Sequence, residues 1–195
     1  MFIVKDVLEQ DRDVKVCEEV SSSWYKLLAW PSHLKQLSCQ VDGNSITAYS
    51  PIAWCGGEVS MGFSGTLATI HGSGTILFAR QADEVISLDL AVCGGSVLLR
   101  KEALLAIPSE CAVSPDEGAL GASGFVTVAG TAKIPITVKL PEKELVTVTL
   151  SEDDALVVGI EQVLYYSTSL HVEQKKEANG LVCFSGDGSI GFWNT

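Results

Sequence analysis

The chain has 195 residues, of which 47% are hydrophobic and 19% charged, and its formal net charge is −11 at pH 7. This composition excludes a disordered chain, and no apolar stretch approaches the roughly 18 residues that a membrane-spanning helix needs. The acidic balance also disfavours RNA or DNA as a partner, because nucleic-acid binding requires clustered Lys and Arg.

Residues 1–37 lie outside the internal repeats described below, and we expect them to form a short N-terminal extension that is helical or extended. Trp24, Leu27 and Leu28 have the i, i+3, i+4 spacing of a helix. Serines precede them, as at a helix N-cap, and Pro31 would end the helix. Both conformations therefore remain open for this segment.

The same extension is rich in aromatic residues, which are enriched at protein–protein interfaces. We therefore predict that residues 1–37 are a docking segment, with Trp24, Tyr25 and Trp30 as candidate interface residues. Packing of these rings into the core is the alternative. The remaining tryptophans, Trp54 and Trp193, fall within the repeats and are expected in or near the core.

Three segments share one pattern: a glycine, a short alternating apolar run, a second glycine, and a small residue before an isoleucine. They cover residues 65–76, 124–134 and 180–190. Strand-like sequence follows each pattern, which excludes a phosphate-binding loop because such loops lead into a helix. The glycines are therefore predicted to be structural turn residues. They are Gly65, Gly72, Gly74, Gly124, Gly130, Gly180, Gly186 and Gly188.

A second recurring element has an apolar run, a polar break and another apolar run, at residues 45–55, 96–107 and 155–166. Together the two elements predict an all-β fold of three repeated units, covering about 38–90, 91–148 and 149–195, in one domain over 38–195. The alternation of Val and Thr in Leu145–Leu150 is typical of a half-buried strand.

Candidate chemistry is sparse. The six cysteines are far apart in sequence, which favours reduced thiols over a zinc site, and the three histidines show no metal-ligand spacing. No Gly-x-Ser-x-Gly motif is present. We therefore predict no catalytic residue, no metal and no cofactor, and no enzymatic activity. The cysteines are Cys17, Cys39, Cys55, Cys93, Cys111 and Cys183.

The chain resembles the altered-inheritance-of-mitochondria protein 24 family over roughly residues 38–195. The segments that carry the resemblance are Gly72–Phe78, Glu84–Leu90, Ser96–Ala106 and Gly180–Trp193. It departs from the family in the middle copy, where Ala132 replaces a glycine, and in residues 1–37. The resemblance implies a fold similar to the tryptophan RNA-binding attenuator protein, with three β units about a pseudo-threefold axis.

The resemblance carries over no functional residue, because the shared positions are glycines and strand residues. It implies a mitochondrial location, with the cytoplasm as the alternative. We expect a non-enzymatic structural or assembly factor that binds other proteins in a larger complex. The alternatives, both disfavoured by the sequence, are a ligand- or RNA-binding module of the attenuator-protein fold and an enzyme with a cupin-like metal site.

Overall fold

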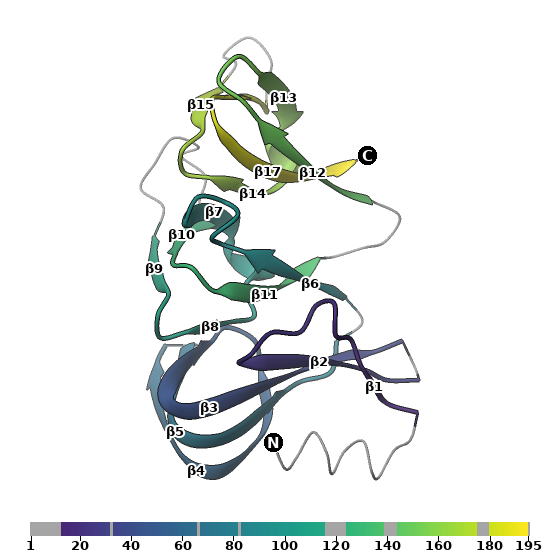
Figure 1. Ribbon diagram of the computed structural model, residues 1–195, viewed down its shortest axis with the longest axis vertical. Helices are drawn as coiled ribbons and strands as arrows, with labels where there is room; N and C mark the ends of the chain where they lie inside the picture. The colour runs from purple at the N-terminus through teal and green to yellow at the C-terminus, as the bar shows by residue number, and fades with distance from the viewer. Residues whose placement is uncertain are drawn as a thin grey trace. The chain divides into compact units, whose positions relative to one another are not determined.

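The computed structural model describes residues 13–31, 33–65, 67–81, 83–115, 124–138, 144–174 and 180–194. These residues form strands β1 to β17 and two single turns of 3-10 helix, η1 and η2, with no α-helix among them (Figure 1). The predicted all-β class is confirmed. The chain divides into two compact units, and each is described by itself.

The first unit contains residues 1–88, 104–109 and 133–139. Its main sheet has the antiparallel order β1-β2-β3-β5-β4, with β8 paired to β3, and β6 and β11 form a separate pair. The strands are β1 (Lys15–Val16), β2 (Tyr25–Ala29), β3 (Lys35–Ala48), β4 (Ile52–Ser64), β5 (Leu67–Phe78), β6 (Glu84–Asp89), β8 (Ala106–Pro108) and β11 (Lys133–Val138).

The core of the first unit lies on one face of β3 and β5, where every second side chain is apolar. Val41 and Ile46 on β3, and Ile70 and Ile76 on β5, are each at most 2% exposed. A shift in the β3–β5 register between Asp42 and Ser45 lets the apolar alternation resume on the same face. Figure 1 shows that β3, β5 and β4 curve strongly together.

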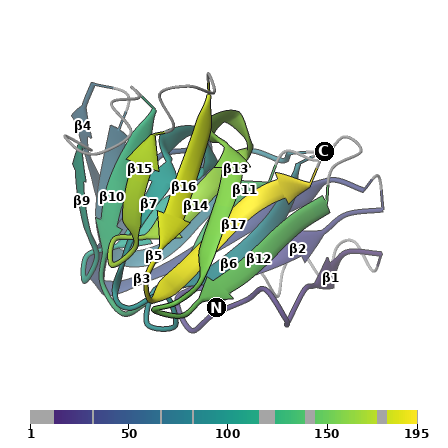
Figure 2. The ribbon, with the colours of Figure 1, turned by 90° about the horizontal axis from the view of Figure 1, so that it is seen from above.

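The second unit contains residues 89–103, 110–132 and 140–195. One sheet has the order β12-β17-β14-β7-β10-β9 and a smaller one the order β13-β16-β15 (Figure 2). The elements are β7 (Ser96–Arg100), η1 (Lys101–Ala103), β9 (Ala112–Pro115), β10 (Phe125–Ala129), β12 (Glu144–Leu150), β13 (Ala155–Gly159), η2 (Ile160–Gln162), β14 (Val163–Ser167), β15 (His171–Gln174), β16 (Leu181–Ser185) and β17 (Gly188–Asn194).

Three aromatic rings pack together in the core of the second unit. Tyr166 lies between Phe125 and Phe184, with ring centroids 6.3 and 5.0 Å away. Arg100 covers one side: its guanidinium lies 5.0 Å from the Phe125 ring centroid and donates hydrogen bonds to the carbonyl oxygens of Val163 and Ile160. This cation therefore ties β7 to the chain around η2 and has a structural role.

The recurring glycines have recurring backbone conformations. In each of the three segments the first two marked glycines have positive φ, and a strand starts just after the first. The third position, Gly74 or Gly188, leaves no room for a Cβ. The three repeated units and their pseudo-threefold axis stay predictions. The positive-φ residues are Gly65, Gly72, Gly124, Gly130, Gly180 and Gly186.

The predicted helix at Trp24–Leu28 is wrong. Residues 25–29 form strand β2, whose backbone pairs with β3 from Tyr25↔Cys39 to Ala29↔Lys35. Burial of Tyr25, Leu27 and Leu28 against the core outweighs a helical spacing that spans little more than one turn.

The expected boundaries meet the structure in different ways. The boundary at residue 37 falls inside β3, and the boundary at residue 148 falls inside β12. The boundary near residue 90 lies close to the division between Leu88 and Asp89 that separates the two units. Segments 104–109 and 133–139 belong to the first unit although they follow this division in sequence, an assignment that only long-range pairing determines.

Candidate functional site

Strand β4 is an edge of the main sheet of the first unit. It pairs with β5 without interruption from Trp54↔Leu77 to Ser64↔Leu67. No described strand pairs with its other side. Every second N–H and C=O group of β4 therefore points away from the sheet, in the arrangement to which another extended chain can add.

The face of β4 that continues the core is apolar, and it is exposed towards the end of the strand. Met61 lies opposite Ile70, and Phe63 lies opposite Ala68, both of which are buried on β5. Yet Met61 is 46% exposed and Phe63 73% exposed. The apolar face of the sheet thus extends one strand beyond the part that the unit itself covers.

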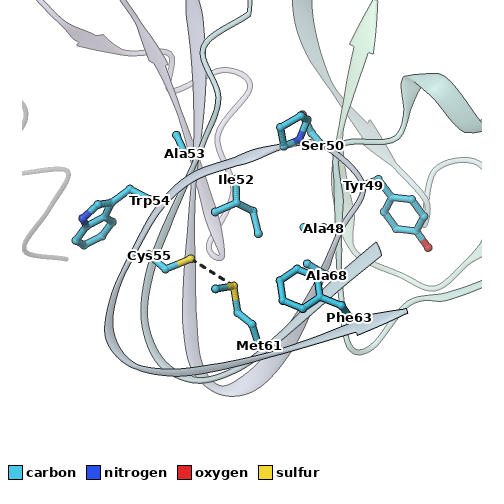
Figure 3. Close-up of a pocket in the computed structure, with 11 residues that line it drawn as sticks. Ala48, Tyr49, Ser50, Ile52, Ala53, Trp54, Cys55, Met61, Phe63 and Ala68 are labelled. Carbon is cyan, nitrogen blue, oxygen red and sulfur yellow. Dashed lines mark hydrogen bonds between the residues drawn. The ribbon is translucent and has the colours of Figure 1, made fainter. Parts of the chain in front are cut away.

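A pocket of about 660 Å³ lies on this face, lined by residues from both ends of β4 (Figure 3). Ile52, Cys55, Met61 and Phe63 point into it from the concave side of the β4–β5 hairpin. It contains no charged side chain, so it suits an apolar group rather than an ionic substrate. The lining residues are Ala48, Tyr49, Ser50, Pro51, Ile52, Ala53, Trp54, Cys55, Met61, Phe63 and Ala68.

Two sulfur atoms meet at the pocket: Cys55 Sγ lies 4.0 Å from Met61 Sδ (Figure 3). Partial burial removes water from the thiol and raises the pKa of Cys55 above its ordinary value. A neutral thiol is a poor nucleophile, because the thiolate is the reactive form. The pair therefore behaves as polarisable apolar surface at neutral pH.

The prediction that Trp54 lies in or near the core is wrong. Its side chain points away from Cys55, on the opposite face of β4, and is 42% exposed (Figure 3). The indole ring lies over Gly56, where any Cβ would overlap it. Trp54 therefore adds a large aromatic surface to the outer side of the same edge strand.

The predicted interface residues of the N-terminal extension lie elsewhere. Tyr25 is only 1% exposed, and its hydroxyl donates a hydrogen bond to Ser87 Oγ at 2.8 Å. Trp24 packs edge-on against Tyr25, with centroids 4.8 Å apart, and its Nε1 donates to the Lys133 carbonyl. Tyr25 is thus a core residue that no partner can reach in this fold.

Trp30 is half-buried and stacks against a cation. The Arg80 guanidinium carbon lies 3.4 Å from the centroid of the Trp30 ring. Nε1 of Trp30 is buried and has no hydrogen-bond partner. The stacked guanidinium covers one face of the indole ring.

The polar residues of the described chain do not converge. No group of three His, Cys, Asp or Glu within it is placed to hold a metal ion. His33, His71 and His171 are all exposed and lie apart along the chain. Burial raises the pKa of Cys39, Cys93 and Cys111, which keeps these thiols neutral.

No motif in the sequence marks Met61 and Phe63 as exposed residues. Met61 and Phe63 alternate with Ser60, Gly62 and Ser64. This alternation predicts a strand with one apolar and one polar face, but it does not show which strands pair with it. The number of small residues in β4 was a usable signal, since strands packed on both sides need bulk.

No protein-family model and no curated protein matches the chain. Its structure is similar to the crystal structure of a Streptococcus pyogenes protein, with a TM-score of 0.62 and 14% sequence identity. The match covers 93% of this chain and 94% of the other. The similarity supports the all-β fold and, at this identity, extends to the fold alone.

Proposed function

We propose that this chain is a non-enzymatic structural or assembly factor that binds other polypeptide chains, with β4 as its binding edge. The observation that carries the proposal is the exposed apolar face of β4, above all Phe63, beside an unpaired strand edge. Proteins normally shorten or charge such edges to prevent association. The thirteen residues of β4 include a single charged residue, Glu58.

The chemistry of the edge supports a polypeptide over a small molecule. Strand addition uses backbone hydrogen bonds for affinity and alternating side chains for specificity. The pocket beside Cys55 and Met61 would then receive an apolar side chain of the added strand. The resemblance to a mitochondrial family makes a mitochondrial complex part of this proposal, which fractionation of cells expressing the protein would test.

The test is affinity capture of the full chain from its own cells, with the double variant Met61→Ser/Phe63→Ser for comparison. The control is Val92→Ser, since Val92 is 77% exposed but lies in a turn outside β4. We expect the wild type and the control to retain the same stoichiometric partners and the double variant to lose them. Partners retained by the double variant would contradict the proposal.

Capture of the chain as a monomer, with no bound protein and no second copy, would also contradict the proposal. That result would favour the ligand- or RNA-binding module, and the purified chain would then be analysed for a bound small molecule or RNA.

A further inference from the structure

We infer that the polypeptide which β4 binds is a second copy of this chain, in an antiparallel pair of β4 strands related by a two-fold axis. The inference rests on the proposed binding role of β4 and adds the identity and the register of the partner. A two-fold interface must be complementary to itself, so the sequence of β4 can be tested against each register.

Matching of the two faces limits the registers. In an antiparallel pair, residues directly opposite each other point to the same face of the sheet. The apolar face of β4 carries the odd-numbered residues from Cys55 to Phe63, and the other face carries Trp54, Glu58 and Ser60. A continuous apolar face requires odd residues opposite odd residues.

Charge disfavours the register centred on the middle of the strand. That register would place Glu58 directly opposite Glu58 of the second copy, and like charges in that position are destabilising. The next register is centred on Val59 and places Glu58 opposite Ser60. It keeps the whole uninterrupted segment from Trp54 to Ser64 paired.

Side-chain size is compatible with the register centred on Val59. The apolar face runs from small residues at one end, Cys55 and Gly57, to large ones at the other, Met61 and Phe63. Antiparallel pairing about Val59 sets Phe63 opposite Cys55 and Met61 opposite Gly57 of the second copy. Each large exposed side chain then meets a small one.

The number of hydrogen bonds is adequate for a stable contact. Eleven paired residues on each strand, from Trp54 to Ser64, would form about ten backbone hydrogen bonds, the number in a typical protein–protein interface. Each copy has a net charge of −11, which opposes association. Since β4 carries one charge, it is an edge on which two acidic copies can meet with little local repulsion.

The first test is sedimentation velocity of the full chain at micromolar concentrations. We expect a dimer for the wild type and for Val92→Ser, and a monomer for Met61→Ser/Phe63→Ser. Glu58→Gln and added salt should both tighten the dimer, by severalfold, because the two Glu58 carboxylates are diagonal neighbours in this register. A wild type that stays monomeric would overturn the inference.

The second test determines the register by disulfide formation in a Cys55→Ser background. Val59→Cys places the two new thiols opposite each other on the two-fold axis. The two Cα atoms are then within the range of roughly 4.4–6.8 Å that a disulfide can span. We expect it to cross-link under mild oxidation, and matched variants Glu58→Cys and Gly62→Cys not to. Cross-linking of either matched variant, and not of Val59→Cys, would overturn the register.

The two proposals fail in different ways. In one outcome, the wild type is monomeric and still binds stoichiometric partners that the Met61→Ser/Phe63→Ser variant loses. That result would overturn the second copy as the occupant and leave β4 as the binding edge. A dimer that cross-links through Val59→Cys, combined with partners that the double variant retains, would support the inference and contradict β4 as the edge for other proteins.

Discussion

Phe63 on β4 lies directly opposite Ala68 on β5, on the face of the sheet that forms the core, yet Ala68 is 6% exposed and Phe63 is 73% exposed. The two residues belong to one apolar row that runs across the sheet, and the first unit covers this row on β5 but not at Phe63 on β4. Because the exposed end belongs to an edge strand, the hydrophobic surface and the unpaired backbone groups occur together. That combination is the basis of the proposed function.

Removal of Phe63 should therefore cost the monomer little stability. We expect Phe63→Ser to change the free energy of unfolding by less than about 0.5 kcal/mol. Ile70→Ala, on the same face but fully buried, should cost about 2–5 kcal/mol. Urea denaturation at submicromolar concentration checks both values. Equal losses for the two variants would mean that Phe63 is covered.

Gly72 should tolerate no side chain. Its φ is 118°, and a Cβ there would overlap the Glu58 carbonyl oxygen on the neighbouring strand. We expect Gly72→Ala to destabilise the protein by about 1–3 kcal/mol. Gly62→Ala is the matched control, because nothing lies within 4 Å of the Cβ position of Gly62. Thermal unfolding of the two variants gives the comparison, and equal melting temperatures would refute the close approach.

The fold class was accessible from the sequence because alternation and glycine spacing are local signals. The sequence predicts two apolar runs around a polar break in each recurring element, and the structure has strands there. The strand pairs are Ser96–Arg100 with Ala106–Pro108, and Ala155–Gly159 with Val163–Ser167. Which strand lies at an edge is decided by long-range pairing. The sequence therefore could not show that Phe63 is exposed while Ile70, seven residues later, is buried.

Tyr25 illustrates the opposite error. Its aromatic neighbours suggested an exposed docking segment, whereas pairing of β2 with β3 buries the ring. We expect Tyr25→Phe to lose about 0.5–1.5 kcal/mol of stability, because the hydrogen bond to Ser87 is removed. A double-mutant cycle with Ser87→Ala measures the coupling. If the two substitutions change the free energy of unfolding additively, the hydrogen bond between Tyr25 and Ser87 is contradicted.

The thiol of Cys39 should make folding sensitive to alkaline pH. Burial raises the pKa of Cys39 well above the 9.0 of an exposed thiol. The unfolded chain then loses its proton first, so this stability is present below about pH 9 and is lost as the pH rises further, by up to about 1.4 kcal/mol per pH unit. Denaturation of wild type and Cys39→Ala from pH 7 to 10 checks this. The difference between their free energies of unfolding should decrease as the pH rises. A constant difference would count against burial of the thiol.

The most direct test of β4 as the binding edge is residue-resolved amide hydrogen exchange over Trp54–Ser64, in the assembled protein and in the dilute monomer. We predict that the amides bonded to β5 exchange slowly in both states. The alternate amides, which point away from the sheet, should exchange rapidly in the monomer and become protected on assembly. Rapid exchange of those amides in both states would contradict the account.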